Sequence, residues 1–204
     1  AIDREPGDLT LSQITESAIS FLTKGNKNGF FLMVEGGKID WACHSNDAAT
    51  AFNEVTDMDN AVQIAYSFYL KHPNETLIVI TADHETGGLA LGTGKYSLNL
   101  KVLENQKVSE VGLSAKINKL RKDKQNNVTW NDIKDLLSEN MGFWGKVTLT
   151  EKQEQLLKEE YIRSFLGKEV KLTESEYFKD EPMAALAKQI LNQIANISWA
   201  SGGH

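Results

Sequence analysis

The sequence predicts an α/β fold, a layered sheet with flanking helices and an added helical insertion. Two continuous apolar runs, FFLMV at 30–34 and LIVI at 77–80, have the composition of strands buried on both faces, which is typical of a parallel sheet. Helical patterns precede the first run and fill the interval between the two runs. The resulting order of helix, strand, helix and strand indicates a sheet joined by right-handed crossovers.

The helices of this first part are predicted from apolar spacing and from end signals. A first helix begins after Asp8 or Thr10, either of which can cap it, and the polar segment KGNKNG breaks it. A second helical region starts at Ile39 and has an expected interruption at residues 45–47. It ends at Pro73, because proline cannot continue a helix.

The amino-acid composition changes after Gly94. Lys, Glu and Gln become frequent there, and no apolar run typical of a buried strand separates the helical patterns. Helices are expected at residues 109–122, 130–139, 150–164 and 181–196, and a last strand at 197–200. We therefore predict two parts. Residues 1–99 and 181–204 form a partial sheet domain, and residues 100–180 form a helical insertion.

Composition excludes several classes of function. The 204 residues carry a formal net charge of −6 and no dense basic block, which argues against a nucleic-acid-binding surface. Cys43 is the one cysteine, so an internal disulfide and a thiolate zinc cluster are both excluded. No apolar stretch reaches the roughly 18 residues of a membrane span. The chain starts without the basic and apolar regions of a secretory signal, so it is either cytoplasmic or a mature chain or part of one.

Carboxylates and imidazoles follow both apolar runs and the last predicted strand. They are Glu35, Asp40, His44, Asp83, His84 and His204. In open α/β sheets, ligand sites gather at the carboxyl ends of the strands, so we expect these groups to converge. Oxygen and nitrogen ligands without thiolate suit a catalytic zinc site. The alternative is that each pair is surface polarity and that the neighbouring glycines are turn residues.

These motifs also resemble a known family. FFLMVEGGKID followed four residues later by His44, and then VITADH at 79–84, are similar to the carboxy-terminal half of alkaline phosphatases. The resemblance covers residues 10–92 and the ending at 198–204, and the helical stretch between them matches only as a variable insertion. It implies an alkaline-phosphatase-like layered sheet, a site with two zinc ions and one magnesium ion, and hydrolysis of phosphate monoesters.

The resemblance also implies a role for each ligand. Asp40, His44 and His204 are the implied ligands of the first zinc, Asp83 and His84 those of the second zinc, and Glu35 that of magnesium. The first zinc would hold the attacking water and the second would activate a serine nucleophile. Trp41 occupies a position that varies within the family and is expected to tune metal occupancy.

Other parts of the family's site are not found in this sequence. No serine follows an aspartate, as the nucleophile motif requires, and the three arginines do not lie where a phosphate-binding arginine is expected. We therefore expect a carboxy-terminal fragment that is inactive alone and that exposes apolar surface and self-associates. For the full-length enzyme, the resemblance implies a homodimer, small phosphate monoesters as substrates, and a periplasmic or secreted location.

Two other interpretations stay open from the sequence. One is another member of the same superfamily, such as a phosphodiesterase, a sulfatase or a phosphoglycerate mutase, because these also place Asp-His pairs at strand ends. The other is a non-catalytic metal-binding or interaction module that uses the helical insertion as its working surface.

Overall fold

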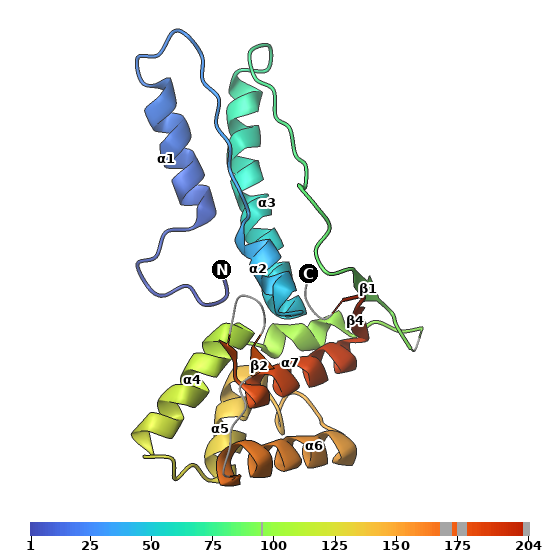
Figure 1. Ribbon diagram of the computed structural model, residues 1–204. Coiled ribbons are helices and arrows are strands. Elements are labelled where there is room, and N and C mark those ends of the chain that lie inside the picture. Colours follow the sequence, from blue (N-terminus) through green and yellow to red (C-terminus); the bar gives the residue numbers. More distant parts are fainter. Residues whose placement is uncertain (95, 168–172, 175–178, 202–204) are drawn as a thin grey trace.

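The computed structural model describes residues 1–94, 96–167, 173–174 and 179–201. The described chain has two tiers (Figure 1). A tall tier holds the long helix α3, two further helices and extended segments, and a lower tier holds a cluster of helices.

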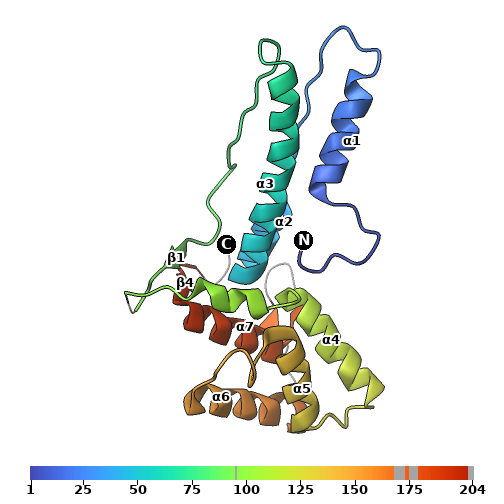
Figure 2. The same ribbon diagram turned by 180° about the vertical axis from the view of Figure 1, so that it is seen from behind.

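The tall tier contains three helices. They are α1 (Leu11–Thr23), α2 (Lys38–His44) and α3 (Ala48–Lys71). The Thr10 side chain caps α1 in a capping box with Gln13, so the predicted start after Thr10 is confirmed. Both α1 and α2 pack against α3, and Figure 2 shows the same arrangement from behind. The predicted break at residues 45–47 is also confirmed, because α2 ends at His44 and α3 begins at Ala48.

The lower tier is built mainly from helices. They are η1 (Leu100–Asn105), α4 (Glu110–Asp123), α5 (Trp130–Met141), α6 (Glu151–Tyr161), η2 (Ile162–Leu166) and α7 (Pro182–Ala195). All four helices predicted after residue 100 are therefore confirmed, with small shifts at their ends. Capping boxes at Thr129 and Thr150 start α5 and α6 and explain why local sequence located them.

The main hydrophobic core lies in the lower tier. Leu113, Ile133, Leu157 and Ile190 are fully buried there, one from each of α4, α5, α6 and α7. Ala48, at the start of α3, belongs to the same core and joins the two tiers. Because α7 packs against α4, α5 and α6, its contacts reach across the predicted boundary at residue 180, and the division into two parts stays a prediction.

The described strands are short. They are β1 (Leu89–Leu91), β2 (Thr173–Glu174), β3 (Lys179–Asp180) and β4 (Ile197–Trp199). The predicted last strand is confirmed as β4, and it pairs with β1 in antiparallel fashion, with Ala90 opposite Ser198. The other pair, β2 and β3, is also antiparallel.

The prediction of two strands buried on both faces is wrong for the described chain. Residues 30–34 and 77–80 run as elongated segments on either side of α3, and neither is assigned as a strand (Figure 1). The exposed fraction is 89% for Phe31 and 86% for Leu77. A parallel strand needs neighbours at its edges and helices on both faces of the sheet, and within the described residues these runs have no paired strand.

Candidate metal centre

The first predicted ligand pair lies on helix α2. Its spacing of four residues places both side chains on one helix face, and His44 Nε2 lies 3.2 Å from Asp40 Oδ2. The His44 side chain is only 13% exposed, whereas about a third of Asp40 is exposed. Spacing alone therefore predicted this contact, and α2 as a whole packs against α3.

The second predicted pair lies in the irregular segment that leads to β1. His84 Nε2 is 3.5 Å from Asp83 Oδ2, and both side chains are more open to solvent than the first pair. His84 Nδ1 lies 2.6 Å from the backbone oxygen of Glu85. This hydrogen bond, followed by the charge of Asp83, raises the pKa of His84.

The segments that carry the two pairs approach each other near the end of α2. Cys43, next to His44 on α2, is buried, and burial raises the pKa of its thiol while a side-chain hydrogen bond with Thr86 lowers it. A Cβ atom on Gly87 would lie 3.5 Å from Asn46 Oδ1, so the segment that carries the second pair passes beside the end of α2. Asp40 is also among the charges that raise the pKa of His84. The two Asp-His pairs therefore lie on segments that approach each other, although about 40 residues separate them along the chain.

The other predicted site residues are distributed as follows. The Glu35 carboxylate folds over the start of α2, with its Oε1 3.3 Å from the point that a Cβ atom on Gly37 would occupy. Trp41 is exposed on α2, and the Lys38 ammonium lies 5.4 Å from the centre of its ring. His204 lies outside the described residues.

Within residues 1–94, 96–167 and the other described stretches, no group of three His, Cys, Asp or Glu side chains is close enough to hold an ion. The ligand set predicted for the first zinc includes His204, so the described residues supply two of its three members. The donors that do come together are carboxylate oxygens and imidazole nitrogens, which fit zinc chemically. The assignment of ions to residues stays a prediction.

Sequence reasoning missed a buried polar network directly after His44. Asp47 caps α3 by accepting hydrogen bonds from the backbone and hydroxyl of Thr50. It also accepts from Gln106 Nε2 at 2.8 Å and from the backbone nitrogen of Glu110 at 2.8 Å. The network continues to α7, where Lys188 Nζ lies 2.8 Å from Glu110 Oε2. An Asp before Ala-Ala-Thr at a helix start is a capping signal that could have located Asp47, but nothing local indicates its distant partners.

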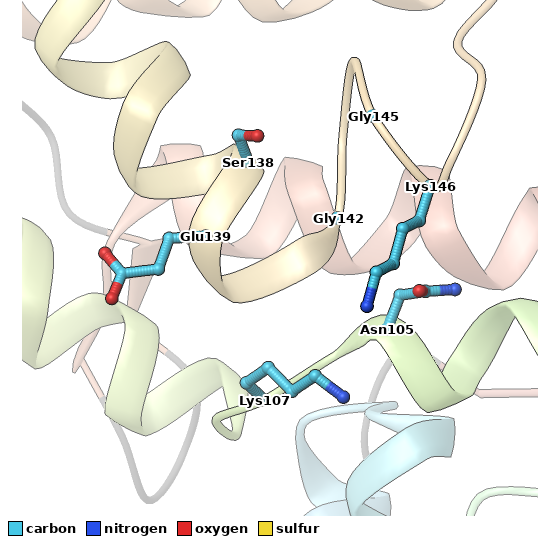
Figure 3. Close-up of a pocket in the computed structure, with 7 residues that line it drawn as sticks. All are labelled: Asn105, Lys107, Ser138, Glu139, Gly142, Gly145 and Lys146. Carbon is cyan, nitrogen blue, oxygen red and sulfur yellow. The ribbon is translucent and has the colours of Figure 1, made fainter.

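A separate hollow lies in the lower tier, between the end of η1, the end of α5 and the turn that follows (Figure 3). Its lining residues are Asn105, Lys107, Ser138, Glu139, Gly142, Gly145 and Lys146. None of them is a predicted metal ligand. The Lys107 ammonium donates a hydrogen bond to the backbone oxygen of Glu104 at 2.7 Å, so one of its donors is satisfied within the protein.

Comparison with known proteins identifies relatives of this chain. A family profile described as alkaline phosphatase matches residues 1–160. Alkaline phosphatase 4 of Bacillus subtilis (strain 168) is 48% identical over 92 residues, which is 45% of this chain and 20% of that protein. Alkaline phosphatase of Escherichia coli (strain K12) is 47% identical over 75 residues, which is 37% of this chain and 16% of that protein.

A solved structure is similar over the whole chain. The crystal structure of a cold-active alkaline phosphatase from a psychrophilic Shewanella species matches with a TM-score of 0.73 and 26% identity. The match covers 100% of this chain and 43% of that structure. It confirms the predicted α/β class. The chain belongs to the alkaline phosphatase family.

The matched region is a small part of the relatives. It spans about a fifth of the Bacillus protein and less than half of the Shewanella structure. Among the described helices, none has both the length and the apolar composition needed to cross a bilayer.

Proposed function

We propose that this chain supplies the metal-binding part of an alkaline phosphatase that hydrolyses phosphate monoesters. The observation that carries the proposal is the pairing of a carboxylate with an imidazole on two separate segments, Asp40–His44 on α2 and Asp83–His84 before β1. The second segment approaches the end of α2, because a Cβ atom on Gly87 would lie 3.5 Å from Asn46 Oδ1. Membership of the alkaline phosphatase family supports the same reaction class.

The proposed ligands follow the prediction from sequence. Asp40, His44 and His204 would hold one zinc, Asp83 and His84 a second zinc, and Glu35 a magnesium ion. Bound zinc ions supply Lewis acidity for an in-line displacement at phosphorus and lower the pKa of a bound water or hydroxyl.

The chain's own residues set the conditions for that chemistry. The mostly buried His44 imidazole is held in place by packing, so little rotamer freedom is lost when it binds an ion. The carboxylates of Asp40 and Asp83 would reduce the charge of bound metal ions without cancelling it, which would leave attraction for a phosphate dianion. Trp41 is exposed beside Asp40, and we expect it to tune metal occupancy.

The proposal includes three features of the whole enzyme that rest on family membership. They are small phosphate monoesters as substrates, a homodimeric assembly, and a location outside the cytoplasm. The 204 residues contain no Asp-Ser pair, so this chain by itself is predicted not to turn over substrate.

Zinc binding tests the site directly. The purified chain is equilibrated with Zn²⁺, dialysed and analysed for bound metal, alone and as His44→Ala. The variant is expected to lose bound zinc relative to the unmodified chain. His72→Ala is the matched control, because His72 ends α3, stacks on Phe68 with ring centres 4.6 Å apart and is not a predicted ligand. Equal zinc content in all three proteins would show that the assignment of His44 is wrong.

Turnover tests the second part of the proposal. The zinc- and magnesium-loaded 204-residue chain is expected to leave p-nitrophenyl phosphate unhydrolysed above the rate in buffer with the same metals. Hydrolysis that disappears in His44→Ala would contradict the predicted inactivity of the isolated chain, and it would at the same time support the metal site.

A further inference from the structure

The turn between α2 and α3 has an unusual backbone at Asn46. Its φ angle is 51°, in the left-handed region that most residues avoid and that asparagine tolerates better than most. The Asn46 backbone nitrogen donates to the Cys43 oxygen at 2.8 Å, which closes the end of α2. Asn46 therefore lies two residues after His44 in a fixed local conformation.

Asn46 makes contacts with two other segments through different groups. Its side-chain Nδ2 donates to the backbone oxygen of Ser201 at 3.0 Å. Its own backbone oxygen accepts from Asn192 Nδ2 of α7 at 2.8 Å. A third segment lies close by, because a Cβ atom on Gly87 would be 3.5 Å from Asn46 Oδ1.

Gly87 and the segment after β4 are also bonded to each other. The backbone nitrogens of Ala200 and Ser201 donate to the Gly87 oxygen at 3.1 and 3.3 Å. The Ala200 nitrogen also lies 3.1 Å from the Gly88 oxygen. The end of α2, the segment after His84 and the segment after β4 thus meet at one junction, with Asn46 at its centre.

We infer that Asn46 is a positioning residue, which fixes the separation between the segment that carries Asp40 and His44, the segment that carries Asp83 and His84, and the segment that leads to His204. This inference rests on the proposed metal-binding function. The predicted ligands of the first zinc come from two of these segments, and the third segment carries the predicted ligands of the second zinc. Each ion needs its donors at a defined spacing, and the two ions need a defined separation, so the group that joins the segments controls metal affinity without binding metal itself.

The size of the effect follows from similar outer groups in metal sites. Loss of a group that orients metal ligands typically lowers affinity by about 10- to 100-fold. Asn46→Gly keeps a residue that accepts the left-handed backbone and removes the bond to Ser201. We expect it to weaken zinc binding by at least about 10-fold, measured by competition with a chromophoric zinc chelator.

Asn196→Gly is a matched control from the same chain. The backbone of Asn196 is also in the left-handed region, with a φ angle of 59°. Its side-chain Nδ2 donates to the backbone oxygen of Ser97 at 2.8 Å. It lies at the end of α7, and its side chain bonds to Ser97 rather than to a predicted ligand. Both substitutions replace a left-handed asparagine by glycine, so we expect similar losses of thermal stability but a loss of zinc affinity only for Asn46→Gly.

A second readout needs no metal. In the metal-free chain, the amide hydrogens of Ala200 and Ser201 are expected to exchange faster in Asn46→Gly than in the unmodified chain or in Asn196→Gly, because their junction with Gly87 opens more often. If Asn46→Gly does not fold, Asn192→Ala removes only the bond to the Asn46 oxygen, and it should weaken zinc binding in the same direction.

The outcomes separate this inference from the function it rests on. If the unmodified chain binds zinc and His44→Ala does not, but Asn46→Gly and Asn192→Ala bind as the unmodified chain does, the positioning role is wrong and the metal site stands. If the unmodified chain binds no zinc, the proposed function fails, and the positioning role fails with it.

Discussion

Gly88 combines a left-handed backbone with a close neighbour, so one added methyl group there should be costly. Its φ angle is 60°, and a Cβ atom there would lie 2.6 Å from the Cβ atom of Ala200. An ordinary contact between such atoms begins at 3.4 Å, so Gly88→Ala forces the segment after β4 to move by about 0.8 Å or the backbone to leave its conformation. Ala200 bonds to Gly87 and Gly88 through its backbone nitrogen, so this movement strains the junction described above.

The expected cost has two parts. An alanine in the left-handed region costs about 1–2 kcal/mol of folding free energy. The overlap with Ala200 adds about 1–3 kcal/mol, as for other overpacked sites. The sum is about 2–5 kcal/mol, with the lower end applying if the segment after β4 detaches locally while the core in α4–α7 stays folded.

Gly92→Ala separates the two parts. Gly92 has a similar φ of 72°, but its nearest neighbour atom would be 4.0 Å from the added Cβ, so only the backbone cost applies. Urea unfolding is followed for both variants, together with hydrogen exchange at the Ala200 amide. We expect a larger loss of unfolding free energy, or much faster exchange, for Gly88→Ala. Equal behaviour of the two variants in both measurements would refute the argument from close approach.

Three further predictions concern charge and exposed surface. The pKa of Asp132 is lowered from 3.8 to about 2, first by its bond with Lys124 and then by the N-cap residue of α5, so its stabilising contribution is present above pH 3.8 and is lost as pH falls towards 2. Asp132→Asn should therefore flatten the decrease in urea midpoint over that pH range, and an unchanged slope would contradict the assignment. Arg121→Met removes the cation 2.5 Å from the fully buried Glu181 carboxylate and should cost about 3 kcal/mol at pH 7. Burial already raises the pKa of Glu181. The variant should therefore recover stability as pH falls and the carboxyl is protonated. A thermal midpoint of the variant that does not rise from pH 7 to pH 5 would count against this. Finally, the exposed apolar run at 77–80 should drive self-association. Leu77→Ser should then lower the apparent mass in sedimentation. An unmodified chain that sediments as a monomer would show that the run does not cause self-association.

The candidate site illustrates how far sequence reasoning reaches. The contact between Asp40 and His44 follows from helix geometry, because a spacing of four residues is enough to place the two side chains together. The approach of the segment that carries Asp83 and His84 to the end of α2 could not be derived in that way. It is seen where Gly87 comes close to Asn46, residues 41 positions apart whose contact leaves no periodic pattern in the sequence.

By itself, the sequence determined the local structure and the family of this protein. Capping residues and apolar spacing located the helices, since a helix satisfies its hydrogen bonds within its own segment. The tertiary structure decided the matters that need distant partners. The runs at 30–34 and 77–80 have the composition of buried strands, but they stay exposed among the described residues because a strand is stabilised only by neighbours that pair with it and cover it. The same holds for Asn46 and Gly88, whose importance comes from the segment after β4, more than 100 residues later in the chain.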